Sequence, residues 1–182
     1  RYVCLVSAAT RALFSGPHYG HDIVEQFDVI GVGSLTVVLL TGFFTGAALT
    51  AQSGLTLDQF GARTQVGRLV GASMIKELGP VLTALMLTGR IGSGIAAELG
   101  SMVVTDQINA LRALGTDPIR KLVVPRVLAG FLMCPVLTVI SDFVGILGGY
   151  LVARFQLQVA SGVYWSSVTR GLWDQDPWMG II

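Results

Sequence analysis

Charged side chains are scarce in this chain of 182 residues, of which only 13% are Asp, Glu, Lys or Arg. A typical soluble domain has about 25%. The net charge of +1 offers no basic surface for nucleic acid. Cysteine is nearly absent as well, and neither Cys4 nor Cys134 has a CxxC motif or a histidine at ligand spacing. We therefore expect buried thiols rather than a metal or redox centre.

Motifs for catalysis and nucleotide binding are also missing. No Ser/His/Asp or paired-carboxylate arrangement is recognisable, so nothing supports an enzyme. The run GRIGSG at 89–94 resembles a nucleotide loop, but it follows no predicted strand, and the chain has no GxxxxGK[ST] motif. His18 and His21 lie three residues apart without a third ligand. We expect no metal in this chain.

Long apolar runs are what the chain does contain. Val29–Ala51 has 23 residues without a charge. As a helix this run would be roughly 34 Å long, enough to cross the hydrocarbon core of a bilayer. Two further runs are long enough although each contains some charge. The predicted fold is an all-α, polytopic membrane helix bundle with transmembrane helices at 29–53, 67–97 and 127–153.

The segments before the first run are more polar. Residues 1–16 place apolar side chains at helical spacing, which predicts an amphipathic helix in the membrane interface; a piece of another span is the alternative. Residues 17–28 predict a loop or a helix start at headgroup level. The chain begins at Arg1 without a methionine and stops at Ile182 just as a new apolar stretch begins. We expect one membrane domain, truncated at both ends.

The polar segment 98–126, between the second and third predicted spans, indicates the orientation. It holds the densest cluster of positive charge, namely Arg112, Arg120, Lys121 and Arg126. Positively charged loops of membrane proteins are found mostly on the cytoplasmic side. This segment is therefore predicted to be cytoplasmic, with the N-terminus on the same side.

Small residues recur four positions apart in successive spans. Such pairs let helix backbones approach closely in lipid. Several of them favour a compact bundle over a set of loose anchors. The pairs are Gly42/Gly46, Gly67/Gly71, Ala96/Gly100 and Gly145/Gly149.

Lys76 and Glu77 are the most unusual charges because they lie inside a predicted span. An ionisable residue in lipid is costly unless it faces a cavity or a partner. Pro80 follows shortly and could bend the helix beside the carboxylate. Two interpretations stay open. The pair either lines a substrate cavity or lies near the outer interface, with Lys76 snorkelling toward water.

Three further charges are predicted to be structural. Arg90 and Glu98 are eight residues apart and share a helix face near the cytoplasmic end of the second span. Asp142 in the third span, or a lipid phosphate, is the expected partner of Arg90. We favour a structural charge pair over a transport role.

A short helix is predicted within 98–126. Thr105 would cap it and Asp106 would lie in its first turn, whereas Gly115 followed by Pro118 would end it. The apolar stripe of this helix must be covered by the chain's own bundle or by a groove on another protein, and the pattern leaves both open. The stripe consists of Ile108, Leu111 and Leu114.

One continuous pattern of motifs extends from about Gly31 to Tyr150. It comprises KELGPV at 76–81, Gly89-Arg90, AELG at 97–100, Asp106-Gln107, Ala110-Leu111, Asp117-Pro118 and Pro125-Arg126. This pattern resembles the MlaE/YrbE permease family. These permeases are the membrane subunits of ABC transporters that work with MCE (mammalian cell entry) domain proteins.

The resemblance implies a function and an assembly. The family moves phospholipids or other lipids between the inner membrane and the outer envelope. We therefore expect a permease subunit in the bacterial inner membrane, with a second copy of itself, a cytoplasmic ABC ATPase dimer and a periplasmic MCE protein as partners. ATP and magnesium would bind the ATPase, and this chain would hold no cofactor. The family fold of an interfacial helix and five spans implies that two spans are missing here.

The resemblance also implies roles for residues. Segment 98–126 would be the coupling helix that contacts the ATPase, which favours docking over folding back. Its candidate contacts are Thr105, Asp106, Ile108, Leu111, Arg112, Leu114 and Asp117. An outward-facing lipid cavity would lie near the outer ends of the first two spans. Its candidate residues are Leu49, Leu57, Phe60, Lys76, Glu77, Leu78 and Val81.

Three other classes of protein compete with this interpretation. A secondary transporter would couple transport to an ion gradient, with Glu77 and Asp142 as titrating sites. A membrane enzyme acting on lipids would need a nucleophile or a metal site, and none is recognisable. A passive scaffold of an envelope complex would need neither. Copurification of an ATPase would separate the permease from all three.

Overall fold

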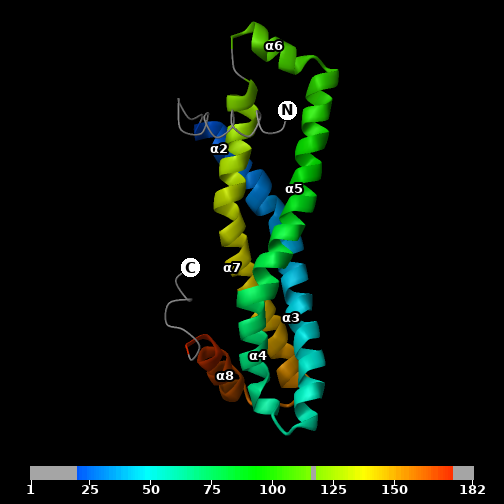
Figure 1. Ribbon diagram of the computed structural model, residues 1–182, viewed down its shortest axis with the longest axis vertical. Helices are drawn as coiled ribbons and strands as arrows, with labels where there is room; N and C mark the ends of the chain where they lie inside the picture. The colour runs from blue at the N-terminus through cyan, green and yellow to red at the C-terminus, as the bar shows by residue number, and fades with distance from the viewer. Residues whose placement is uncertain (1–19, 116–117, 174–182) are drawn as a thin grey trace. The chain divides into compact units, whose positions relative to one another are not determined.

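The computed structural model describes residues 20–115 and 118–173, and it is helical almost throughout (Figure 1). None of these residues belongs to a β-strand. The predicted interfacial helix at 1–16 lies outside the described residues. The all-α prediction is confirmed for the part of the chain that is described.

The first long helix begins earlier than predicted. Helix α2 covers Gly20–Phe27, a π-helical turn η1 covers Asp28–Val32, and α3 covers Gly33–Gln59. They contain a candidate membrane span of 36 residues, Val24–Gln59. The polar residues before Val29 therefore start the helix rather than form a loop.

The second long helix is continuous over 42 residues, Arg63–Val104. It begins with a short 3-10 turn, η2, and contains a π-helical turn, η3, directly before α5. The bounds are Arg63–Gln65 for η2, Val66–Ser73 for α4, Met74–Leu78 for η3 and Gly79–Val104 for α5.

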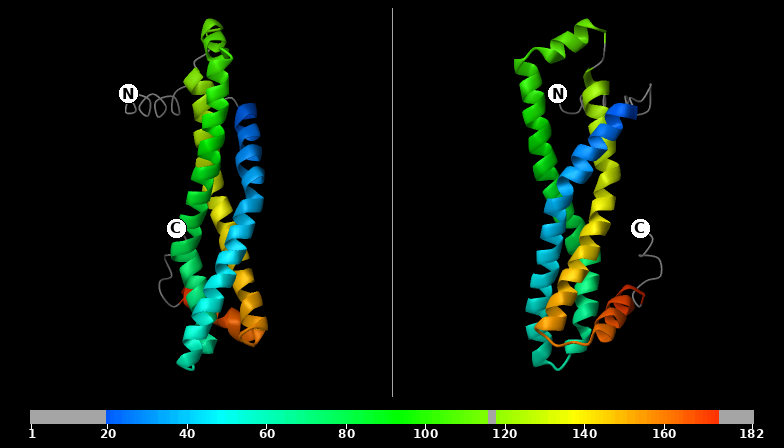
Figure 2. Two further views of the ribbon diagram at one scale, coloured as in Figure 1. Left: turned by 90° about the vertical axis from the view of Figure 1, so that its right-hand side faces the viewer. Right: turned by 180° about the vertical axis from the view of Figure 1, so that it is seen from behind.

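The third long helix follows a short connecting helix. The elements are α6 at Gln107–Ala113, π-helical turn η4 at Ile119–Val123, α7 at Val124–Phe155 and α8 at Ser161–Trp173. The part long and apolar enough to cross a membrane is Lys121–Phe155. Figure 2 shows the long helices from two further directions. All three predicted spans are thus confirmed, and each is longer than the sequence indicated.

Two of the π-helical turns lie just ahead of a proline. Pro80 follows η3 and Pro125 follows η4, each as the second residue after the turn. Proline has no backbone N–H, and its ring clashes with the carbonyl of the preceding turn of an α-helix. A wider turn avoids that clash; at η3 the Gly79 N–H donates to the Met74 carbonyl, five residues back. The helices therefore continue through these prolines.

Much of the apolar surface of the three spans is not covered by this chain. Only 28%, 28% and 22% of the residues in their most apolar windows are buried. Phe44, Phe131 and Phe143 are each more than half exposed. Helices that are apolar on all sides are typical of membrane spans. The exposed faces are suited to lipid or to other membrane subunits.

The chain divides into two compact units that share the three long helices. Unit 1 contains the described residues up to Leu35 and Leu87–Pro135, and unit 2 contains Thr36–Met86 and the described residues from Val136 onward. Each unit is described by itself below.

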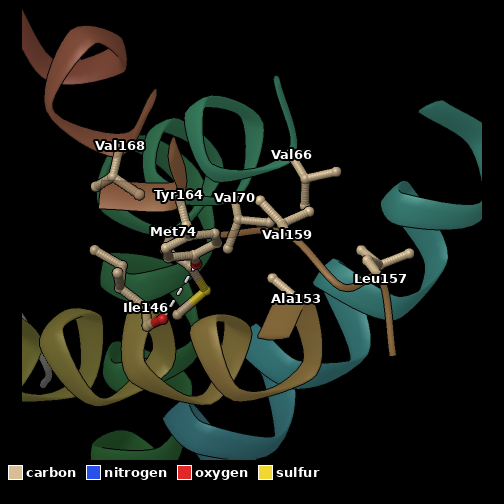
Figure 3. Close-up of a cluster of buried hydrophobic side chains, with 9 residues drawn as sticks. All are labelled: Val66, Val70, Met74, Ile146, Ala153, Leu157, Val159, Tyr164 and Val168. Carbon is tan, nitrogen blue, oxygen red and sulfur yellow. Dashed lines mark hydrogen bonds between the residues drawn. The ribbon is translucent and has the colours of Figure 1, made fainter. Parts of the chain in front are cut away.

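Unit 2 has an apolar core in which α8 packs along α4 (Figure 3). Tyr164 of α8 is fully buried there, and its hydroxyl donates to the Ile146 carbonyl over 3.2 Å. Burial raises the pKa of Tyr164 to about 12, so the hydroxyl keeps its proton. The core residues are Val66, Val70, Met74, Ile146, Ala153, Leu157, Val159, Tyr164 and Val168.

Glycines let α3 and α7 cross closely within unit 2. A Cβ atom at Gly46 would overlap the backbone carbonyl of Gly145, and one at Gly42 would lie 2.8 Å from the Ser141 carbonyl oxygen. The Gly42/Gly46 and Gly145/Gly149 pairs thus allow a close crossing, as expected, and the structure shows that the first and third spans are the ones that meet there. Gly67 likewise lies against the Tyr164 carbonyl of α8.

One predicted crossing is wrong. A Cβ atom at Gly100 would meet nothing within 4 Å among the described residues. The Ala96/Gly100 pair therefore makes no close helix contact inside this part of the chain. Small-residue spacing alone does not say which helix, if any, approaches.

Candidate functional site

An apolar hollow lies on α3 within unit 2. Its volume is about 400 Å³, within the range of sites that bind small molecules. Thr45 and Gln52 supply the polar groups of an otherwise apolar lining. The lining residues are Phe44, Thr45, Ala48, Leu49 and Gln52 of α3 and Leu78 of η3.

The hollow includes only part of the predicted lipid cavity. Leu49 and Leu78 line it. Leu57 instead packs against the apolar core of unit 2, and Phe60 and Val81 are exposed rather than part of the lining. Sequence reasoning missed four of the lining residues. These four residues lie on one face of α3, and their helical spacing could have revealed that face. Because α3 is apolar on most sides, its hydrophobic pattern does not distinguish one face from the others.

Lys76 and Glu77 lie in the π-helical turn η3, and both side chains are exposed. They directly precede Leu78, which lines the hollow. The wider turn changes the direction in which successive side chains leave the helix axis. The structure therefore places a charge pair next in sequence to the wall of an apolar hollow.

Asp142 of α7 lies against α5 within unit 2. Its carboxylate lies against Gly79 and fills the space that a Cβ there would need. The side chain is only 8% exposed, and its Oδ1 has no hydrogen-bond partner among the described residues. Arg90 donates from Nη1 to the Ser34 hydroxyl over 2.7 Å, inside unit 1.

The partner of Glu98 is Arg126 at the start of α7. Nη2 of Arg126 lies 2.5 Å from Oε1 of Glu98. The Arg126 side chain is buried, whereas that of Glu98 is about half exposed. The sequence did not reveal this pairing, because it depends on how the chain folds back through α6. The ion pair joins the two helices that flank α6.

Helix α6 begins one residue later than predicted. Its N-cap is Asp106, which has a left-handed backbone with φ of 56° and accepts a hydrogen bond from the Asn109 side chain over 2.9 Å. The predicted cap, Thr105, instead donates from its hydroxyl to the Ser101 carbonyl in the last turn of α5. Gly115 ends the helix with φ of 73°, as predicted.

The apolar stripe of α6 is only partly covered by the chain. Ile108 and Arg112 line a groove of about 300 Å³ together with Leu99 and residues of the segment after α6. Leu111 is half-buried, and Leu114 is 79% exposed. One end of the stripe therefore packs on the chain itself, and the other end is exposed among the described residues, so docking on another protein stays a prediction. The candidate Asp117 lies outside the described residues.

Cys134 is a thiol in α7 and is half-buried rather than buried. The other cysteine, Cys4, lies outside the described residues. Within the described ranges, no three His, Cys, Asp or Glu side chains are grouped as metal ligands would be.

The chain is similar to known permeases over most of its length. Residues 23–182 match the family described as Permease MlaE. A probable ABC transporter permease protein of Rickettsia conorii is 42% identical over 175 residues, which cover 96% of this chain and 68% of that protein.

Two more distant organisms have comparable relatives. The intermembrane phospholipid transport system permease protein MlaE of Haemophilus influenzae is 41% identical over 161 residues, 88% of this chain and 62% of that protein. A probable ABC transporter permease protein of a Synechocystis species is 42% identical over 155 residues, 84% of this chain and 59% of that protein. With three helices able to span a membrane, the chain is a multi-pass membrane protein and belongs to the MlaE permease family.

Proposed function

We propose that this chain is the permease subunit of an ABC transporter that moves phospholipid between the bacterial inner membrane and the outer envelope. The observation that carries the proposal is its 41% identity to a phospholipid transport permease over 88% of its length. The apolar hollow beside a charge pair supports the same function. Transport of an amphiphile needs both kinds of surface.

The hollow suits one end of a phospholipid and the charge pair suits the other. An acyl chain would lie against Phe44, Leu49 and Leu78. The headgroup, with its phosphate and its ammonium or hydroxyl groups, would contact Lys76 and Glu77. Charges inside a span are typical of residues that contact a polar substrate group.

Helix α6 is the proposed contact for the ATPase. Leu114 is exposed and Leu111 half-buried, so an apolar edge is available to a partner. The Glu98–Arg126 ion pair fixes the ends of the flanking helices, so a push on α6 would reach α5 and α7. ATP and magnesium would bind the separate ATPase chains, with α6 in the cytoplasm.

Two further partners are proposed at the outer face and within the membrane. An MCE protein in the periplasm would receive or deliver the lipid. A second copy of this chain would cover part of the apolar surface, of which less than a third is buried in each span. The transporter would then be a permease dimer with an ATPase dimer.

The test separates lipid handling from coupling. Glu77→Lys reverses the charge beside the hollow and should abolish ATP-dependent phospholipid transfer in proteoliposomes, while the ATPase still copurifies. Leu111→Asp with Leu114→Asp should release the ATPase in a pull-down. Glu25→Lys, on the exposed side of α2, is the control for charge reversal. Equal effects of the first two variants on both readouts would contradict this division of roles.

An ion-coupled secondary transporter is the second candidate. It is favoured by Asp142, a buried carboxylate with an unpartnered oxygen inside a span. This function requires lipid transfer that follows an imposed ion gradient and proceeds without ATP. Transfer that needs ATP and is unchanged when the gradient is collapsed would eliminate it.

A further inference from the structure

A second site, which is polar, lies where α4 and α8 pack together in unit 2. Its cleft has a volume of about 190 Å³ and a mainly polar lining. It shares no lining residue with the hollow on α3. The polar lining residues are Thr64, Gln65, Arg68, Ser166, Ser167 and Arg170.

Two arginines of like charge line this one cleft. Gly171 of α8 packs against the aliphatic part of the Arg68 side chain, and a Cβ atom at Gly171 would lie 2.9 Å from Cγ of Arg68. This contact brings Arg170, the residue before Gly171, to the same cleft as Arg68. Among the described residues neither arginine has an ion-pair partner, and the nearby acid Asp58 pairs with Arg63 instead. Like charges so placed repel each other, and a bound anion would remove that repulsion.

The arginines are the charged hydrogen-bond donors of the cleft, beside the neutral side chains of Thr64 and Gln65. The Ser166 hydroxyl donates to the Val163 carbonyl over 3.0 Å, and that of Ser167 donates to the Tyr164 carbonyl over 2.7 Å. Their protons are therefore used within α8. Each guanidinium offers five N–H donors in a planar fork that fits phosphate oxygens two at a time.

The aromatic side chains beside this cleft favour a position at membrane-surface depth. Tyr150, Tyr164 and Trp165 form a cluster with ring centroids 5.6 to 6.0 Å apart. Tyrosine and tryptophan are enriched where the apolar core of a bilayer meets the headgroups. Trp165 directly precedes the two serines of the cleft, so the arginines lie close to the layer that contains lipid phosphates.

We propose that the Arg68–Arg170 cleft binds the phosphate of an anionic phospholipid as a fixed surface lipid, apart from any lipid that is transported. Among the described residues these two cations have no counter-charge, which favours a headgroup with net negative charge over a zwitterionic one. A bound lipid would hold α8 against α4. This proposal needs the membrane location of the chain but does not depend on lipid transport.

The test measures lipid binding to the detergent-purified complex by native mass spectrometry. Binding of the anionic lipid phosphatidylglycerol is compared with binding of the zwitterionic lipid phosphatidylcholine. For Arg68→Gln with Arg170→Gln, the tightest phosphatidylglycerol site should be lost or its Kd should rise about tenfold or more. Arg154→Gln, an exposed arginine outside the cleft, is the matched control and should bind as the native chain does.

Three results would overturn the proposal. The first is unchanged affinity for phosphatidylglycerol in the double variant, or in Arg170→Gln alone should the double variant fail to fold. The second is complete displacement of the lipid by an equal concentration of inorganic phosphate, which would assign the cleft to a free anion. The third concerns thermal stability. If the double variant lost the same amount of stability with added lipid as without it, the arginines would be assigned to an ion pair within the complex.

Discussion

The crossing of α3 and α7 provides a direct test of the packing in unit 2. Gly46→Ala adds one methyl group where a Cβ would overlap the backbone carbonyl of Gly145. Backbone cannot move aside as a flexible side chain does, so the helices must separate by on the order of 1 Å or bend. Overpacking of this kind costs about 1–3 kcal/mol.

A matched substitution removes the effect of helix propensity. Gly89→Ala makes the same chemical change in α5, where a Cβ would meet nothing within 4 Å among the described residues. Replacing a mid-helix glycine by alanine should stabilise that helix by up to about 1 kcal/mol. The free energies of unfolding of the two variants should therefore differ by at least about 1–3 kcal/mol.

The assay is thermal unfolding in detergent, followed by the accessibility of thiols to a fluorescent probe. The expected order of melting temperatures is Gly89→Ala, then the native chain, then Gly46→Ala, with the two variants several degrees apart. If Gly46→Ala melted at or above Gly89→Ala, the close crossing of α3 and α7 would be refuted.

Four further substitutions test polar contacts by the same assay. Glu98→Gln should lower the stability more than Arg126→Gln does. The first variant leaves the buried guanidinium of Arg126 without a counter-charge, whereas the second leaves only the half-exposed carboxylate of Glu98 unpaired. A larger loss of stability in Arg126→Gln would contradict this reasoning. Tyr164→Phe loses the hydrogen bond to Ile146 and should cost about 0.5–1.5 kcal/mol, and a more stable variant would refute that bond. Asp142→Asn keeps the shape but removes a buried charge, so stability should stay equal or rise; a loss above about 1 kcal/mol would point to an essential carboxylate.

The spans were predictable because lipid imposes a simple requirement on sequence. A helix must offer about 20 apolar residues to cross the core, and three runs do. Their ends were not predictable to the residue. Polar segments such as 20–28 and 63–66 continue the helices beyond the apolar stretch, since a helix does not need to end where it leaves lipid.

The partners of individual charges were harder to predict. Arg90 contacts Ser34, Glu98 contacts Arg126, and Asp142 lies against Gly79. Each contact joins residues from different helices, and helical spacing determines only the face on which a side chain lies. The rotation of neighbouring helices decides the partner, and that depends on packing of the whole unit.

The candidate site was predictable only through the residues that also carry the family pattern. KELG at 76–79 drew attention to the segment that forms η3, and Leu78 of this segment lines the hollow. The π-helical turn itself was not foreseen, although a proline two residues beyond it was visible in the sequence. Phe44, Thr45 and Gln52 were missed because nearly every face of α3 is apolar.

We propose that this chain moves phospholipid with energy from ATP that a partner chain binds and hydrolyses. The most direct measurement is transfer of a labelled phospholipid out of proteoliposomes that contain the copurified complex. The account predicts transfer that requires hydrolysable ATP and is lost in Glu77→Lys. Transfer at full rate without ATP, driven by an imposed ion gradient, would contradict it.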